Sequence, residues 1–92
     1  MSNKFKSVFD AIADTPQEAL NMKLRAQLMN EIIRKIEKKG WSQATSAKKL
    51  GVTQPRISDL KRGKMSKFSL DMLVNMLAAI GDEVEIKIKK AA

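Results

Sequence analysis

The chain has 92 residues, a net charge of +8 and neither cysteine nor histidine, and this composition argues against several classes of protein. The length suits one compact domain with a modest core. Without cysteine there is no disulfide framework and no thiolate chemistry, so we expect a reducing, cytoplasmic setting. Without histidine the commonest general base and the commonest metal ligand are missing. We therefore expect no enzyme activity, no catalytic residues, no metal and no cofactor.

The positive charge is concentrated in the middle of the chain. Residues 41–67 hold seven Lys and Arg against one Asp, for +6, whereas residues 1–40 carry +3 and residues 68–92 carry −1. This distribution suits contact with a polyanion, although a solvated, lysine-rich surface would have the same composition. No stretch approaches the roughly 20 apolar residues of a membrane span, and we expect no signal peptide.

Two helices are expected within the first 40 residues. A short amphipathic helix is predicted by an apolar repeat made of Phe5, Val8, Phe9 and Ile12. It either packs on the domain or across a dimer, or it binds a partner protein such as a toxin. A T-x-x-E capping box at Thr15 starts a long helix that ends at Gly40, with a break near Asn21 as an alternative. Its expected apolar stripe is Leu20, Leu24, Leu28, Met29, Ile32, Ile33 and Ile36.

Two short helices follow and have the pattern of a helix-turn-helix. Ser42 caps a helix over Gln43–Leu50, and Thr53 caps another over Gln54–Arg62. The motif requires a small residue where the helices cross and a glycine at the turn, which are Ala47 and Gly51. Its apolar positions are filled by Leu50, Val52, Ile57 and Leu60. The departure is Ser46, at a position that is usually apolar, where the hydroxyl can bond back to its own helix.

The last third of the chain predicts a helix and then a strand. After a loop over Lys64–Phe68, Ser69 caps a helix over Leu70–Ile80. Beyond it the period changes to two, which predicts a half-buried β-strand with Val84, Ile86 and Ile88 on its apolar side. A lone strand cannot satisfy its own hydrogen bonds, so we expect it to pair with the same strand of a second copy. The alternative is an edge that docks on a toxin by β-augmentation.

The outer face of the second short helix is the candidate reader of DNA. At about 100° per residue, Ile57 and Leu60 turn inward and leave a polar face that suits a major groove. The candidate base contacts are Gln54, Pro55, Arg56, Ser58 and Asp59. Asp59 either accepts from a cytosine amino group or holds Arg56 or Arg62 in a fixed rotamer, and the easy geometry of an i, i+3 pair favours the second. Trp41 is either a packing residue or a DNA contact.

These motifs resemble those of a known family. SQATSAKKLGVTQPRISDLKRGK followed by FSLDMLVNMLAAIG resembles the lambda-repressor-like helix-turn-helix of the XRE family. Over Phe9–Ile88 the chain is more narrowly similar to small HigA-type antitoxins, through VFDAIADTPQEALNMKLR, TQPRISDLKRGK, FSLDMLVNML and VEIKI. The resemblance implies an all-α, lambda-repressor-like fold with five helices, and a homodimer; we expect the C-terminal β-strand to pair across it. We expect residues 1–14 to form an N-terminal segment, 15–81 the DNA-binding domain, and 82–92 the dimerisation strand and tail.

The same resemblance implies a function and a set of backbone contacts. It implies a bacterial, nucleoid-associated repressor that binds a palindromic double-stranded operator in its own operon and neutralises a RelE-like toxin. It also implies that Gln43 bonds a phosphate and braces Gln54, and that the Gly63-Lys64 turn lies over the DNA backbone. The expected phosphate contacts are Ser42, Gln43, Thr53, Arg62 and Lys64. Two other functions remain open: a stand-alone phage-type XRE regulator without a toxin, and a non-specific nucleic-acid adaptor.

Overall fold

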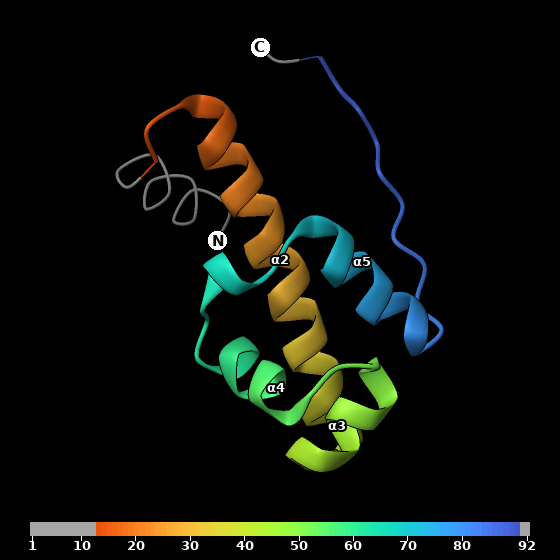
Figure 1. Ribbon diagram of the computed structural model, residues 1–92. Coiled ribbons are helices and arrows are strands. Elements are labelled where there is room, and N and C mark those ends of the chain that lie inside the picture. Colours follow the sequence, from red (N-terminus) through yellow and green to blue (C-terminus); the bar gives the residue numbers. More distant parts are fainter. Residues whose placement is uncertain (1–12, 91–92) are drawn as a thin grey trace.

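The computed structural model describes residues 13–90, and all the regular secondary structure within that range is helical. Four α-helices and one 3-10 turn follow in the order α2 (Pro16–Lys39), α3 (Gln43–Leu50), α4 (Gln54–Lys61), η1 (Met65–Lys67) and α5 (Leu70–Ala79). Figure 1 shows α3 and α4 together near one end of the long α2, with α5 beside its middle. The predicted helix with Phe5, Val8, Phe9 and Ile12 lies outside the described residues.

Each α-helix begins where a side-chain hydroxyl caps its first turn, as the sequence predicts. The capping hydroxyls accept from the backbone N–H three residues later, and they belong to Thr15, Ser42, Thr53 and Ser69. Each cap satisfies one of the donors that a helix start leaves free. The Glu18 carboxylate accepts from the N–H of Asp14 at 3.3 Å, one residue before the N–H that a capping box normally uses.

The predicted helix ends are correct to within one residue. The long helix runs without a break through Asn21, and Gly40 ends it in the left-handed conformation with φ 66°. The second short helix and the last helix each stop one residue early, because Arg62 and Ile80 are their C-terminal caps. The expected loop over residues 64–68 contains η1, a single turn that the sequence pattern did not predict.

The core lies between the C-terminal half of α2 and helices α3, α4 and α5. Its most deeply buried side chains are Ile32, Ile57, Leu60, Leu73 and Met76. The predicted stripe on α2 is correct only in this half of the helix. Toward its N-terminus Leu20 and Leu24 are 58% and 42% exposed, and Ala19 and Ala26 are buried instead. There Ala19 and Ala26 form the buried face of the helix, and Met65 of η1 packs against them. The large apolar residues of the predicted stripe there, Leu20 and Leu24, lie on a different, exposed face.

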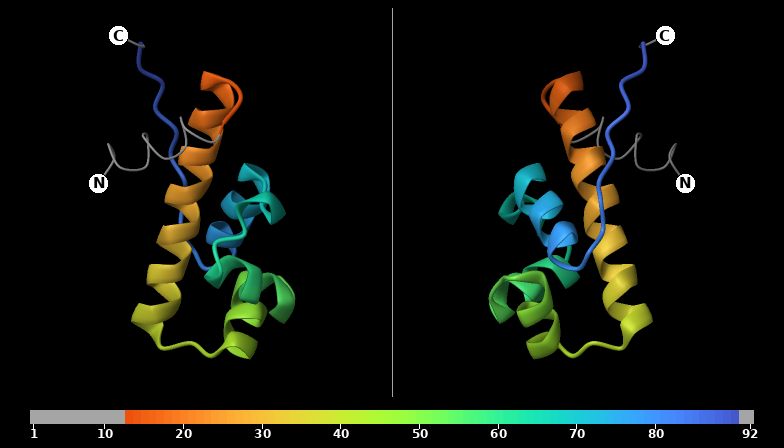
Figure 2. Two further views of the ribbon diagram at one scale, coloured as in Figure 1. Left: turned by 90° about the vertical axis from the view of Figure 1, so that its left-hand side faces the viewer. Right: turned by 90° about the vertical axis from the view of Figure 1, so that its right-hand side faces the viewer.

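The predicted C-terminal strand is not formed in this single chain. Residues 82–90 have no regular secondary structure, and their backbone runs from the end of α5 toward the end of the molecule at which α2 begins (Figures 1 and 2). A strand needs a neighbouring strand to complete its hydrogen bonds, and the described residues contain none. As a result Ile86 and Ile88, expected to be half-buried, are 79% and 95% exposed. No described helix is long and apolar enough to cross a membrane.

Candidate nucleic-acid interface

The turn between α3 and α4 depends on the backbone conformation of Gly51. Its φ is 71°, in the left-handed region that residues with a side chain rarely adopt. A Cβ built at Gly51 would meet no atom within 4 Å, so conformation selects glycine here and crowding does not. The N–H of Val52 then donates to the carbonyl of Ala47 at 3.0 Å and closes the turn. This geometry brings the first residues of α4 back toward the start of α3.

The N-terminal ends of α3 and α4 lie side by side. The Gln43 Nε2 donates to the backbone carbonyl of Gln54 at 3.2 Å, which ties the first residue of one helix to the first residue of the other. Neither helix has an acidic residue in its first turn, whereas α2 has Glu18 and α5 has Asp71. The partial positive charge of these two helix starts is therefore left without an internal counter-charge. Paired helix starts of this kind suit phosphate groups.

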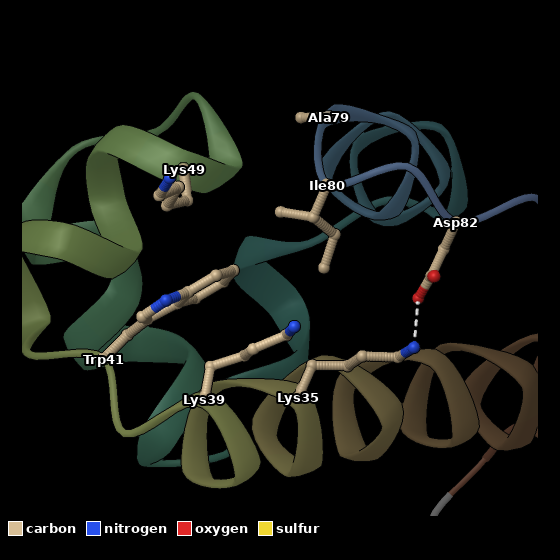
Figure 3. Close-up of a pocket in the computed structure, with 7 residues that line it drawn as sticks. All are labelled: Lys35, Lys39, Trp41, Lys49, Ala79, Ile80 and Asp82. Atoms are coloured by element: carbon tan, nitrogen blue, oxygen red, sulfur yellow. Dashed lines mark ion pairs between the residues drawn. The ribbon is translucent and has the colours of Figure 1, made fainter.

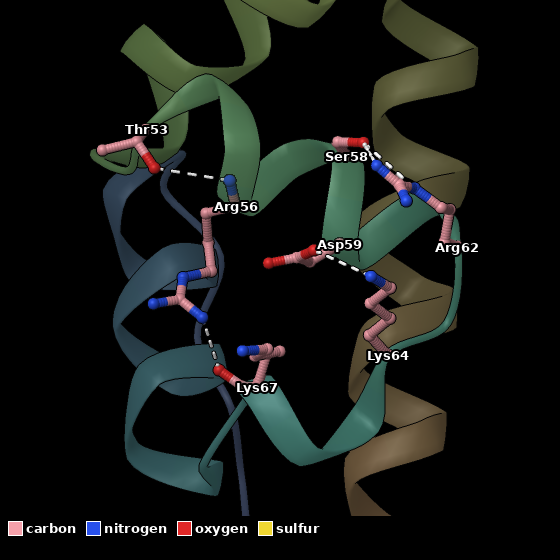
Figure 4. A network of polar contacts seen from close by, with 7 residues as sticks. All are labelled: Thr53, Arg56, Ser58, Asp59, Arg62, Lys64 and Lys67. Carbon is pink, nitrogen blue, oxygen red and sulfur yellow. Dashed lines mark hydrogen bonds and ion pairs between the residues drawn. The ribbon is translucent and has the colours of Figure 1, made fainter.

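Two of the predicted base-reading residues are open to solvent at the start of α4. The side chains of Gln54 and Pro55 are exposed, whereas Ser58 and Asp59 are half-buried. Ser58 is occupied by a neighbour, because the Nε and Nη2 of Arg62 donate to its hydroxyl at 3.2 and 2.8 Å (Figure 4). The exposed part of the face nearest the paired helix starts thus consists of an amide and a proline ring.

Arg56 points away from the rest of this face and toward η1. Its Nη1 donates to the carbonyl of Lys67 at 2.9 Å (Figure 4). Its guanidinium carbon also lies 5.6 Å from the centre of the Phe68 ring. A guanidinium that bonds a carbonyl and also lies over an aromatic face is held by two favourable contacts. In the free protein Arg56 therefore joins α4 to the turn before α5, and its predicted base contact would require breaking both.

Asp59 does not hold either of the arginines that it was expected to brace. Its nearest basic partner is Lys64, with an Oδ1–Nζ distance of 3.9 Å. Arg56 and Arg62 are engaged by Lys67 and Ser58 instead. The i, i+3 spacing allowed an Asp–Arg pair, but longer-range contacts with η1 compete for one guanidinium and a serine hydroxyl for the other. A long, partly exposed pair such as Asp59–Lys64 is weak.

Sequence reasoning missed Arg25, which supports the same region from the other side. Its Nη1 donates to the carbonyls of Met65 and Phe68 at 3.1 and 3.4 Å, and its Nε donates to Asn21 at 2.7 Å. The η1 turn, which follows Lys64, is therefore bonded to α2 through Arg25 and to α4 through Arg56. Met65 and Phe68 lie 40 and 43 residues from Arg25 in sequence, so helical spacing alone could not identify them.

Ser46 is fully buried, and its hydroxyl has no hydrogen-bond partner in the part of the chain that the structure describes. The back-bond expected for it within its own helix is absent. Ser46 is thus a local weakness in the packing of α3, away from the exposed face.

Trp41, which precedes α3, packs against the core. It borders a hollow of about 380 Å³ that also contains Lys35, Lys39 and Lys49 (Figure 3). Lys49 lies over the Trp41 ring, with 6.0 Å between its Nζ and the ring centre. Lys35 bonds Asp82 at 2.8 Å, and this bond raises the pKa of Lys35 above its ordinary value. Trp41 is therefore a packing residue, and the hollow beside it is lined by basic side chains.

The turn at Gly51 and the exposed outer side of α4 define a helix-turn-helix module of the DNA-binding class. A family model described as a helix-turn-helix domain matches residues 11–89, and the chain belongs to that family. The family and the fold together indicate a DNA-binding regulator. No curated protein matches the chain. Within residues 13–90 no cluster of acidic side chains is suited to hold a metal ion.

Proposed function

We propose that the protein is a sequence-specific, dimeric transcriptional repressor and the antitoxin of a type II toxin–antitoxin pair. It would bind a palindromic operator in its own operon and neutralise a RelE-like toxin in the cytoplasm. The observation that carries DNA binding is the pair of adjacent helix starts at Gln43 and Gln54, free of acidic residues, in the region of highest positive charge.

Each part of the face has a proposed role. The Gln54 amide can pair with adenine in the major groove, and Pro55 can lie against a thymine methyl group. Ser42, Gln43 and Thr53 lie at the two helix starts, where their side chains and free backbone N–H groups favour phosphates. Lys64 and Arg62 flank this face and contribute counterion release. The antitoxin role is supported by the resemblance to HigA-type sequences.

The DNA-binding role is tested by selecting sites from a random DNA library and measuring affinity for the selected site at several salt concentrations. Lys64→Ala should weaken binding to all sequences and reduce the salt slope by about 1. Arg34→Ala, which removes an equal charge from the exposed face of α2, is the matched control and should leave the slope unchanged. Failure to enrich any sequence would contradict the specific repressor.

The antitoxin role has its own test. A gene adjacent to this one that encodes a short protein should arrest growth when expressed alone, and co-expression of the present protein should restore growth. The two proteins should also co-purify. A neighbour without toxicity, together with specific operator binding, would leave the stand-alone regulator as the correct function.

A further inference from the structure

The largest exposed apolar side chains of the described residues lie in two segments that pass beside each other. They are Leu20, Leu24, Ile86 and Ile88. Between α2, α5 and the C-terminal segment runs a groove of about 320 Å³, with apolar walls from Leu24, Leu28, Leu70, Val74, Val84 and Ile86. Val84 already packs against the core, but the residues that follow it leave the groove partly uncovered. Exposed apolar surface that continues from a groove is typical of an interface.

The charge pattern of the C-terminal segment has a two-fold symmetry about Ile86. The segment reads Glu83-Val84-Glu85-Ile86-Lys87-Ile88-Lys89. If two such segments run antiparallel with the two copies of Ile86 opposite each other, each Glu85 faces Lys87 of the other copy. Each Glu83 then faces Lys89, and Val84 faces Ile88. Every directly opposite pair is either apolar with apolar or acidic with basic.

Other arrangements lose this complementarity. A parallel, in-register pair sets Glu against Glu and Lys against Lys. An antiparallel pair shifted by two residues places either two copies of Glu85 or two copies of Lys87 directly opposite each other. Like charges directly opposite each other destabilise a strand pair. A shift by one residue would set apolar side chains against charged ones and turn one apolar set outward.

We propose that two copies of the chain join through an antiparallel two-stranded ribbon centred on Ile86, whose apolar face covers the groove on both copies. This inference rests on the proposed dimeric function and specifies its interface. Opposite residues of an antiparallel pair point to the same face, so both sets of Val84, Ile86 and Ile88 face the helices. Ile88 then lies beside the partner's Val84, which accounts for its high exposure in one chain alone.

Single cysteines provide the sharpest test, because the chain has none of its own. Opposite Cα atoms in an antiparallel pair are about 4.5–5.5 Å apart, within the range of a disulfide. Ile86→Cys should therefore cross-link to itself under mild oxidation. Val84→Cys should not, because its two copies would be separated by about 13 Å, or four residues along a strand. A mixture of Val84→Cys and Ile88→Cys should cross-link only between the two variants.

Charge reversal tests the same register without oxidation. Glu85→Lys and Lys87→Glu each place like charges opposite each other in two pairs, so each variant should raise the dimer Kd by about tenfold. Mixing the two variants should restore the wild-type affinity, because each Lys then faces a Glu. The double variant Glu85→Lys/Lys87→Glu should also dimerise normally. In a parallel ribbon the wild type already sets like charges opposite each other, so neither single variant should weaken the dimer.

The outcomes separate this proposal from the proposed function. Efficient self-cross-linking of Val84→Cys, or failure of Ile86→Cys to cross-link in a protein that sediments as a dimer, would overturn the ribbon while leaving the dimeric repressor intact. A monomer that binds the selected operator would overturn both the ribbon and the dimer. If the protein is a monomer on its own and uses residues 84–88 to bind a toxin, this segment is a toxin-binding site and the ribbon is overturned.

Discussion

Arg25 and Arg56 hold the same short turn from two different helices. Arg25 donates to the carbonyls of Met65 and Phe68, and Arg56 donates to the carbonyl of Lys67 between them. The carbonyls at the end of η1 are therefore bonded to two guanidinium groups. Because this turn connects α4 to α5, the two arginines set how α4 lies against the rest of the domain.

Replacing Arg25 should destabilise the domain without removing a DNA contact. Arg25→Met keeps the aliphatic stem but leaves the carbonyls of Met65 and Phe68 without this donor, so we expect a loss of about 1–3 kcal/mol in the free energy of unfolding. Arg34→Met is the matched control on the same helix, since Arg34 is exposed and bonds only Glu31. It should change stability by less than about 0.5 kcal/mol. Urea denaturation measures the stability of both variants. Equal losses in Arg25→Met and Arg34→Met would contradict a stabilising role for the bonds from Arg25 to Met65 and Phe68.

Gln54 and Arg56 should affect DNA binding in different ways. Gln54→Ala removes an exposed amide and should reduce the preference for the selected site over a scrambled one, with little effect on stability. Arg56→Ala removes the contacts with Lys67 and Phe68, so it should lower the stability by about 1–2 kcal/mol and weaken binding to both DNA sequences alike.

The two measurements are the urea midpoint and the ratio of affinities for the two DNA sequences. Arg56→Lys keeps the charge but not the forked donor geometry and should restore little of the lost stability. A change in the affinity ratio with an unchanged midpoint for Arg56→Ala would mean that the guanidinium leaves η1 and reads a base in the complex.

Ser46→Ala should stabilise the protein. It removes a buried hydroxyl that has no partner in the structure and leaves a side chain close to it in size, so we expect a gain of about 1 kcal/mol. Ser69→Ala should have the opposite sign and cost about 1 kcal/mol, because it removes the cap of α5. Thermal denaturation of the two variants measures both effects: Tm should rise for Ser46→Ala and fall for Ser69→Ala. A loss of stability in Ser46→Ala would show that its hydroxyl is bonded after all.

The ion pair between Lys35 and Asp82 should give stability that depends on pH. The bond to Asp82 raises the pKa of Lys35 above 10.5 in the folded state. A raised pKa stabilises the fold fully below 10.5, and this contribution is lost as the pH rises through the folded value. The difference in Tm between the wild type and Lys35→Met should therefore be constant from neutral pH to about pH 10 and shrink above it. A difference that grows at high pH would contradict this sign.

The helix boundaries could be predicted because their signals are local. Thr15, Ser42, Thr53 and Ser69 each bond a backbone N–H only three residues away, and Gly40 and Gly51 end helices by their own conformation. The exposure of Leu20 and Leu24 could not be predicted, because it depends on where η1 lies against α2. For the same reason helical spacing suggested an arginine partner for Asp59, whereas the structure places Lys64 nearest to it.

The site shows the same division between local and distant contacts. The exposed positions of Gln54 and Pro55 follow from the period of one short helix, and the structure has them exposed. The orientation of Arg56 depends on Phe68, which lies across a loop, and the roles of Arg25 and Lys67 depend on the same loop. The strand predicted over residues 84–88 requires a second strand, which residues 13–90 do not contain.

The caps at the start of every α-helix also bear on how quickly the chain folds. Because each helix is bounded by signals within its own sequence, helical segments can begin to form before distant residues meet, and much of the native structure is short-range. Small helical domains with this organisation fold in microseconds to milliseconds. A helix-turn-helix regulator that refolds on this timescale would regain its α4 face soon after any local unfolding, well before the seconds to minutes of a proline-limited step.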